Sequence, residues 1–208
     1  MKPATGDQTG PTTAAQNAVN KPSASAGKSD DSDWQTVETS SDEFTFTLRL
    51  PPGWKWDPEN WQAGKLTSFE CTIFLEVDGH KAFGSEKIES AKAGAKNSLA
   101  SLPDEEQRNK SIKSKNKFLD HRIIQLGDQD AAWHVETVTA PGLTQPASMS
   151  ATSYLSTSGY QFTITGHRDD IRPGRTAKDF DESRAEFLKI SQTFRVTSVD
   201  PIDDQDEE

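Results

Sequence analysis

The sequence predicts an α+β domain that contains a β-sheet of several strands and two helices. Strand-like alternation of apolar and polar residues is seen in three segments: residues 44–50, 69–77 and 160–165. Apolar residues recur at helical spacing in two others: residues 85–102 and 180–190. The second helix leads into a short closing strand, residues 193–196, so this end of the chain is a structural frame and not a catalytic motif.

Breakers and caps set the predicted boundaries in the first half of the domain. Pro51-Pro52-Gly53 ends the first strand, because proline cannot donate to a β-ladder. Phe74 points outward from the second strand, so that strand is expected to be covered on both faces. Asp78-Gly79 after it is typical of a tight turn. Ser85 is the expected N-cap and Pro103 the expected end of the first helix, with an exposed charged connection at 104–117.

The second half of the domain is predicted to form hairpins. Residues 118–126 and 131–140 flank the turn sequence Gly-Asp-Gln-Asp at 127–130. A strand rich in Ser and Thr follows at 147–156, and Ser158-Gly159 turns the chain into the strand at Tyr160. Four residues are expected to be buried close together on one sheet face: Phe46, Ile73, Phe162 and Phe194.

Composition divides the chain into a domain with two tails. Residues 1–33 contain no aromatic side chain, so they cannot bury enough apolar area to offset the entropy of ordering them. Residues 199–208 are strongly acidic. We therefore predict a disordered tail rich in Ala, Ser, Thr and Pro at 1–33, a single domain at 34–198 and a disordered acidic tail at 199–208.

Charge and residue content limit the classes of partner and compartment. The formal net charge of −10 argues against nucleic-acid binding, which needs basic surface. No apolar run is long enough for a transmembrane helix, and the single cysteine, Cys71, is expected to be a buried structural thiol. The N-terminal composition resembles the tether of bacterial lipoproteins. A removed, lipidated leader would place the protein in the bacterial cell envelope or periplasm, tethered to a membrane. Without such a leader it would be cytoplasmic.

Two segments are candidates for contact with a partner. Trp54, Trp56 and Trp61 fall within one short stretch, where they either cap the core or form an aromatic contact surface. Trp54 is assigned to the core, which leaves Trp56 and Trp61 for the surface. The connection after the first helix is rich in lysine, and Lys113 and Lys115 could contact an acidic partner or lie in a solvated loop.

Two histidines are candidate centres of metal binding or acid–base chemistry. His134 and Glu136 share one strand face and could bind a metal if a third ligand joined them. His167 stands close to Asp169 after the Tyr160 strand, where it could act in acid–base chemistry or belong to a solvated loop with local ion pairs. The sequence contains no recognised catalytic or nucleotide-binding motif. No catalytic, cofactor or metal residue is therefore assigned.

Three stretches resemble the PsbP-like family, named for an extrinsic subunit of photosystem II: FTFTLRLPPGW at Phe44–Trp54, GDQDAAWHVE at Gly127–Glu136, and GYQFTIT at Gly159–Thr165 joined to FLKISQTFRV at Phe187–Val196. The family also includes a Ran-binding nucleotide-release factor, bacterial lipoproteins and secretion-associated chaperones. The resemblance spans most of residues 44–196, with Thr193 where the family usually has Ser. It implies a central, mostly antiparallel β-sheet flanked by helices, an α-β-α sandwich.

The function implied by this resemblance is non-catalytic. We expect an accessory protein that acts by binding another protein, without a cofactor. Two alternatives stay open from the residues. One is a metal-dependent hydrolase that uses His134, Glu136, His167 and Asp169, which would need these groups to converge in a pocket. The other is a domain that binds a lipid or small molecule in an apolar cavity.

Overall fold

The computed structural model describes residues 31–65, 71–82, 90–109, 115–139, 146–170, 172 and 177–199. The elements are β1 (Gln35–Ser40), β2 (Phe44–Leu50), β3 (Trp54–Asp57), β4 (Gln62–Lys65), β5 (Cys71–Lys81), α1 (Ala91–Asn109), β6 (Lys115–Leu126), β7 (Gln129–Thr139), β8 (Ser148–Thr157), β9 (Tyr160–Asp170), α2 (Ala177–Gln192) and β10 (Arg195–Val199). The predicted tails lie outside the described residues, except that Asp31–Asp33 form a turn of 3-10 helix and Val199 ends β10.

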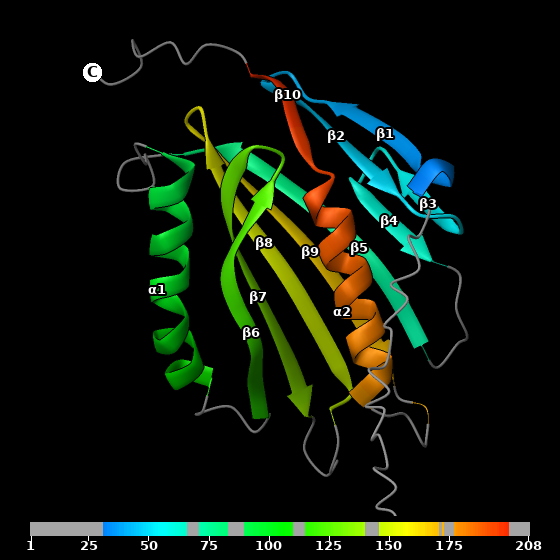
Figure 1. The fold of residues 1–208 in the computed structure, drawn as a ribbon, viewed down its shortest axis with the longest axis vertical. Coiled ribbons are helices and arrows are strands. Elements are labelled where there is room, and N and C mark those ends of the chain that lie inside the picture. The colour runs from blue at the N-terminus through cyan, green and yellow to red at the C-terminus, as the bar shows by residue number, and fades with distance from the viewer. Residues whose placement is uncertain are drawn as a thin grey trace, which may run out of the picture. The chain divides into compact units, whose positions relative to one another are not determined.

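The strands form two antiparallel sheets (Figure 1). The small sheet has the order β1-β2-β10, and the large sheet has the order β3-β4-β5-β9-β8-β7-β6. Within the large sheet the predicted hairpins are confirmed, because β6 pairs with β7 and β8 pairs with β9. The predicted α+β class with a mostly antiparallel sheet is therefore confirmed. Strands β1, β3 and β4 are not among the predicted strands.

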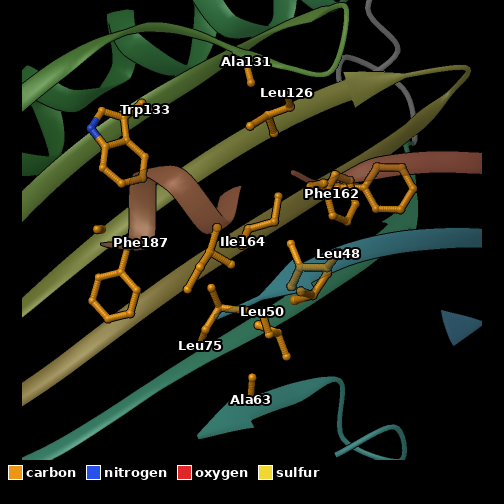
Figure 2. Packing of buried hydrophobic residues seen from close by; sticks show 14 of the residues in the cluster. Leu48, Leu50, Ala63, Leu75, Leu126, Ala131, Trp133, Phe162, Ile164 and Phe187 are labelled. Carbon is orange, nitrogen blue, oxygen red and sulfur yellow. The ribbon is translucent and has the colours of Figure 1, made fainter. Parts of the chain in front are cut away.

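The core lies between the two sheets and beneath α2. Figure 2 shows Leu48 and Leu50 of β2 beside Leu75 and Ile164 of the large sheet. The four residues predicted to be buried, Phe46, Ile73, Phe162 and Phe194, are all buried. They do not share one sheet face, however, because β2 belongs to the small sheet. The ring centroid of Phe194 lies 5.3 Å from that of Phe46 and 5.5 Å from that of Phe162, so this residue joins the two sheets.

Helix α2 approaches the large sheet closely at Gly166 of β9. A Cβ atom at this position would overlap the ring of Phe187, which is fully buried. The ring of Phe187 in turn meets Trp54 edge-on, at 6.1 Å between centroids. A glycine in this strand thus lets an aromatic side chain of the helix sit directly against the backbone of the sheet.

Helix α1 packs against β6, β7 and β8. On β7 and β8, the side chains that alternate with the core residues are buried as well. His134 and Thr152 are each 5% exposed, and this burial assigns α1 to the face of the sheet opposite α2. Along the described chain, no helix is both long and apolar enough to cross a membrane.

The predicted boundaries of the first helix are wrong. It begins at Ala91, after Ser90, whose Oγ accepts the backbone N–H of Ala93. Ser85 lies outside the described residues. The helix continues past Pro103 to Asn109. A proline inside a helix removes one hydrogen bond and crowds the preceding turn, which commonly kinks the helix without having to end it. The segment 104–117, predicted as an exposed connection, therefore contains the last residues of α1 and the first residues of β6.

Asp78-Gly79 is not a turn. Strand β5 runs through it to Lys81, with Gly79 opposite Phe162 of β9. A Cβ atom at Gly79 would lie 2.8 Å from ring atoms of both Phe162 and Phe44. The glycine is explained by this close approach of two aromatic rings to the backbone, and a local sequence signal cannot distinguish that cause from a turn.

Candidate interaction surfaces and the predicted site residues

Trp56 and Trp61 lie on the β3–β4 hairpin at one edge of the large sheet (Figure 1). Both side chains are half-buried and pack against the core. Their rings meet Phe46 edge-on, at centroid distances of 6.3 Å and 5.7 Å respectively. Within the described ranges, the buried Nε1 of Trp56 has no hydrogen-bond acceptor. Each tryptophan therefore has one part committed to the core and another at the surface.

The tip of this hairpin holds Trp61 in a strained conformation. Its φ angle is 51°, in the left-handed region that bulky residues avoid, at a cost on the order of 1–3 kcal/mol. The Trp61 carbonyl accepts the N–H of Val77 at 2.9 Å, which helps to hold it there. Next to it, hydrogen bonds from the side chain of Asn60 and the backbone N–H of Glu59 lower the pKa of Asp57. The hairpin is thus held in a defined conformation.

The third tryptophan of this stretch and the two candidate lysines are placed differently. Trp54 is 4% exposed and donates from Nε1 to Glu186 of α2 at 3.1 Å, which confirms its assignment to the core. Lys115 begins β6, at the opposite edge of the large sheet from β3, and Lys113 lies outside the described residues. The structure therefore does not bring Lys115 together with Trp56 and Trp61.

The side chain of His134 is buried against aromatic rings and is not exposed to bind a metal. Its ring stacks on Tyr154 at 5.6 Å and meets Phe118 edge-on at 5.9 Å. Burial, with a smaller effect from His121, lowers the pKa of His134 to about 4. The imidazole is consequently neutral at neutral pH. Strand β8 separates it from His167 on β9.

His167 belongs to a cluster that crosses three strands on the outer face of the large sheet. Its Nδ1 lies 3.2 Å from Oγ of Ser150 on β8, and its Nε2 lies 3.2 Å from Oε1 of Glu76 on β5. The ring stacks on Phe74 at 4.7 Å. Sequence reasoning missed Ser150 and Glu76 because only the strand order places them beside His167. Asp169 lies two residues further along β9 and is exposed.

A serine, a histidine and a carboxylate in contact are also the components of a nucleophilic hydrolase. Such chemistry needs N–H donors for the developing oxyanion. Here the cluster lies in the middle of the sheet, where β5, β8 and β9 are each paired on both sides, so their backbone donors are engaged in the ladders. The proposed metal ligands do not converge either. The described segments contain no group of three or more His, Cys, Asp or Glu side chains suited to a metal.

The segment His167–Asp170, considered as a solvated loop, is part of β9. Asp170 is fully buried and accepts hydrogen bonds from Arg168 at 2.7 Å and from Arg172 at 2.6 Å. These hydrogen bonds hold the pKa of Asp170 well below its ordinary range despite its burial, and the bond from Arg172 has the largest effect. Arg168 also donates to the Oγ of Ser183 on α2 at 2.8 Å. The network ties β9 to α2 and has a structural role.

Cys71 lies opposite Asp170 in the β5–β9 ladder and is 3% exposed. Burial, followed by the charge of Asp170, raises the pKa of the thiol. A thiol is reactive only as the thiolate. The expectation of a buried structural cysteine is therefore supported.

Two exposed apolar side chains on β6 were not singled out from the sequence. Leu119 is 39% exposed and Ile123 is 37% exposed, and across the described residues these are the exposed large hydrophobic side chains. β6 is the last strand of the large sheet, and the register with β7 shifts between Phe118 and Asp120 at a β-bulge. The alternation pattern predicted a strand here but did not show that it forms an edge.

No family model and no curated protein matches this sequence. Solved structures match by fold. LpqN of Mycobacterium tuberculosis, described as involved in cell envelope biogenesis, superposes with a TM-score of 0.51 at 14% identity, over 81% of this chain and 94% of that one. Cyanobacterial PsbP of Synechocystis sp. PCC 6803 superposes with a TM-score of 0.48 at 12% identity, over 85% and 99%. The chain has the PsbP-like fold. The Ran-binding protein Mog1p of Saccharomyces cerevisiae is a further PsbP-like structure, with a TM-score of 0.45 at 12% identity over 78% and 95%.

Proposed function

We propose that this PsbP-like domain is a non-catalytic accessory protein that binds another protein through the β3–β4 hairpin. The observation that carries the proposal is the pair Trp56 and Trp61, half-buried at an edge of the large sheet. Tryptophan is enriched at binding hot spots because it buries a large rigid surface at a small entropic cost. The positive φ of Trp61 adds support, since strained backbone conformations cluster at functional sites.

The geometry of the hairpin fits a protein partner. In the described part of the chain β3 pairs with β4 on one side only, so its other edge can pair with an extended segment. The exposed residues Lys55 and Glu59 lie on the same hairpin as the tryptophans and can provide a polar rim. A partner would cover the exposed parts of Trp56 and Trp61 and leave their inner faces on the core.

The proposal is tested with the full chain as bait against an extract of the source organism. The variants are Lys55→Glu, which changes the hairpin edge without touching the core, and Trp56→Ala. Their matched controls are Lys92→Glu on α1 and Trp34→Ala, another half-buried tryptophan on the core. We expect one protein to be retained by wild type and both controls and to be lost from both hairpin variants. Identical captured sets for hairpin variants and controls would contradict the assignment of this surface.

A further inference from the structure

Strand β6 is a long strand at the edge of the large sheet, and none of the described strands pairs with its second side. It has twelve residues and pairs with β7 alone among the described elements. At roughly 3.3 Å per residue, a strand of this length extends for about 40 Å. The N–H and C=O groups on its open side form a template for another strand.

The same strand carries the exposed apolar side chains Leu119 and Ile123. Natural proteins usually keep such side chains off open edges, because an apolar edge recruits other chains. Between these two residues lie Asp120, His121 and Arg122. Asp120 accepts from Trp133 Nε1 at 3.3 Å and lies 3.5 Å from Nε of Arg122, whose side chain is 54% exposed.

We propose that two copies of this chain pair antiparallel through β6, with His121 opposite His121 of the second copy. This register is self-complementary. It places Asp120 opposite Arg122 of the other copy, and it brings Leu119, the extra residue of the β-bulge, next to Ile123 of the other copy. Two-fold symmetry produces each of these contacts twice. Cross-strand apolar pairs and pairs of opposite charge both stabilise a ladder.

Other arrangements of the same strand are less favourable. Shifting the two-fold axis by one residue would place Asp120 opposite Asp120 or Arg122 opposite Arg122, and like charges in direct opposition destabilise a ladder. A parallel arrangement in register would place each of these charged residues beside the same residue of the second copy. In the proposed register Lys117 lies opposite Gln125, so the lysines of the two copies lie at opposite ends of the seam.

The pairing surface is separate from the proposed binding surface. β6 and β3 are the two opposite edges of the large sheet, so a dimer through β6 leaves the Trp56–Trp61 hairpin accessible. Either proposal can therefore fail without the other. The variants Lys55→Glu and Trp56→Ala are expected to leave self-association unchanged.

Sedimentation equilibrium of the full chain, from micromolar to millimolar concentration, tests the proposal. We expect a reversible shift from the monomer mass to twice that mass. Leu119→Lys and Ile123→Glu should each weaken self-association about tenfold, because each change removes two apolar pairs. An equimolar mixture of the two variants should associate more strongly than either alone, since lysine at one position then faces glutamate at the other. Thr36→Lys, an exposed change on the edge strand β1 of the small sheet, is the matched control.

Hydrogen exchange supplies a second readout. Backbone amides of residues 119–123 should become more protected as the concentration of the chain rises. A monomer at millimolar concentration would overturn the proposal, as would a dimer that both β6 variants leave unchanged. Protection of β6 that appears only when a different protein is added would assign the edge to that protein and would also overturn self-pairing.

Discussion

The burial of His134 predicts a specific dependence of stability on pH. The side chain is 5% exposed and lies between the rings of Tyr154 and Phe118. Its pKa in the folded domain is lowered to about 4, mainly by burial. The change His134→Phe keeps an aromatic ring in this position and removes the titrating group. At neutral pH a swap of similar volume should change the free energy of unfolding by less than about 1.5 kcal/mol.

The sign and size of the effect follow from the two pKa values. In the unfolded chain an imidazole has a pKa near 6.5, so between that value and about 4 the unfolded chain binds a proton that the folded domain does not. The stability associated with neutral His134 is therefore complete above the unfolded pKa and is lost as the pH falls toward the folded pKa. From pH 7 to about pH 4.5 the loss is about 2 kcal/mol.

Urea unfolding followed by tryptophan fluorescence, at about pH 7 and about pH 4.5, measures this loss. Carboxylates also titrate in this range, so the relevant quantity is the difference between wild type and variant. Wild type should lose about 2 kcal/mol more than His134→Phe on acidification. His80→Gln, at an exposed histidine on β5, should respond to pH like wild type. An equal pH response of wild type and His134→Phe would refute the burial of an uncharged imidazole.

Three further changes, one of them with a matched control, test the packing by urea unfolding. Phe162→Ala should reduce the free energy of unfolding by about 3–5 kcal/mol because the ring is 1% exposed, and a loss below about 1 kcal/mol would show the face assignment to be wrong. Gly166→Ala should cost about 1–3 kcal/mol or more, since the added methyl overlaps Phe187. Gly64→Ala, with open space around it, should cost far less, and equal effects would contradict the close approach of α2. Asp170→Asn should cost about 3–5 kcal/mol because it leaves Arg168 buried without its carboxylate. A neutral result there would show that the network is dispensable.

The candidate site could be predicted from the sequence only in part. The concentration of tryptophans identified the segment Trp54–Trp61 as a candidate but not as the β3–β4 hairpin that the structure shows. The sequence PPGW after the first predicted strand separated the core residue Trp54 from Trp56. The local sequence could not show how far Trp56 and Trp61 are buried, because their burial depends on Phe44 and Phe46, which belong to the other sheet. For the same reason His167 was paired with Asp169, its neighbour in sequence. Its contacts in the structure, Ser150 and Glu76, lie on adjacent strands.

By itself the sequence determined the strand faces, the two late hairpins and the α+β class with its PsbP-like resemblance. Alternation, helical spacing and turn residues are local properties, and each can be read within a few positions. The tertiary structure alone decided which strands are edges, that β1, β2 and β10 form a second sheet, and that aromatic rings pack directly against Gly79 and Gly166. These features depend on contacts between residues far apart in the chain. That is why Leu119 and Ile123 have the pattern of an ordinary strand in the sequence and lie on an open edge in the fold.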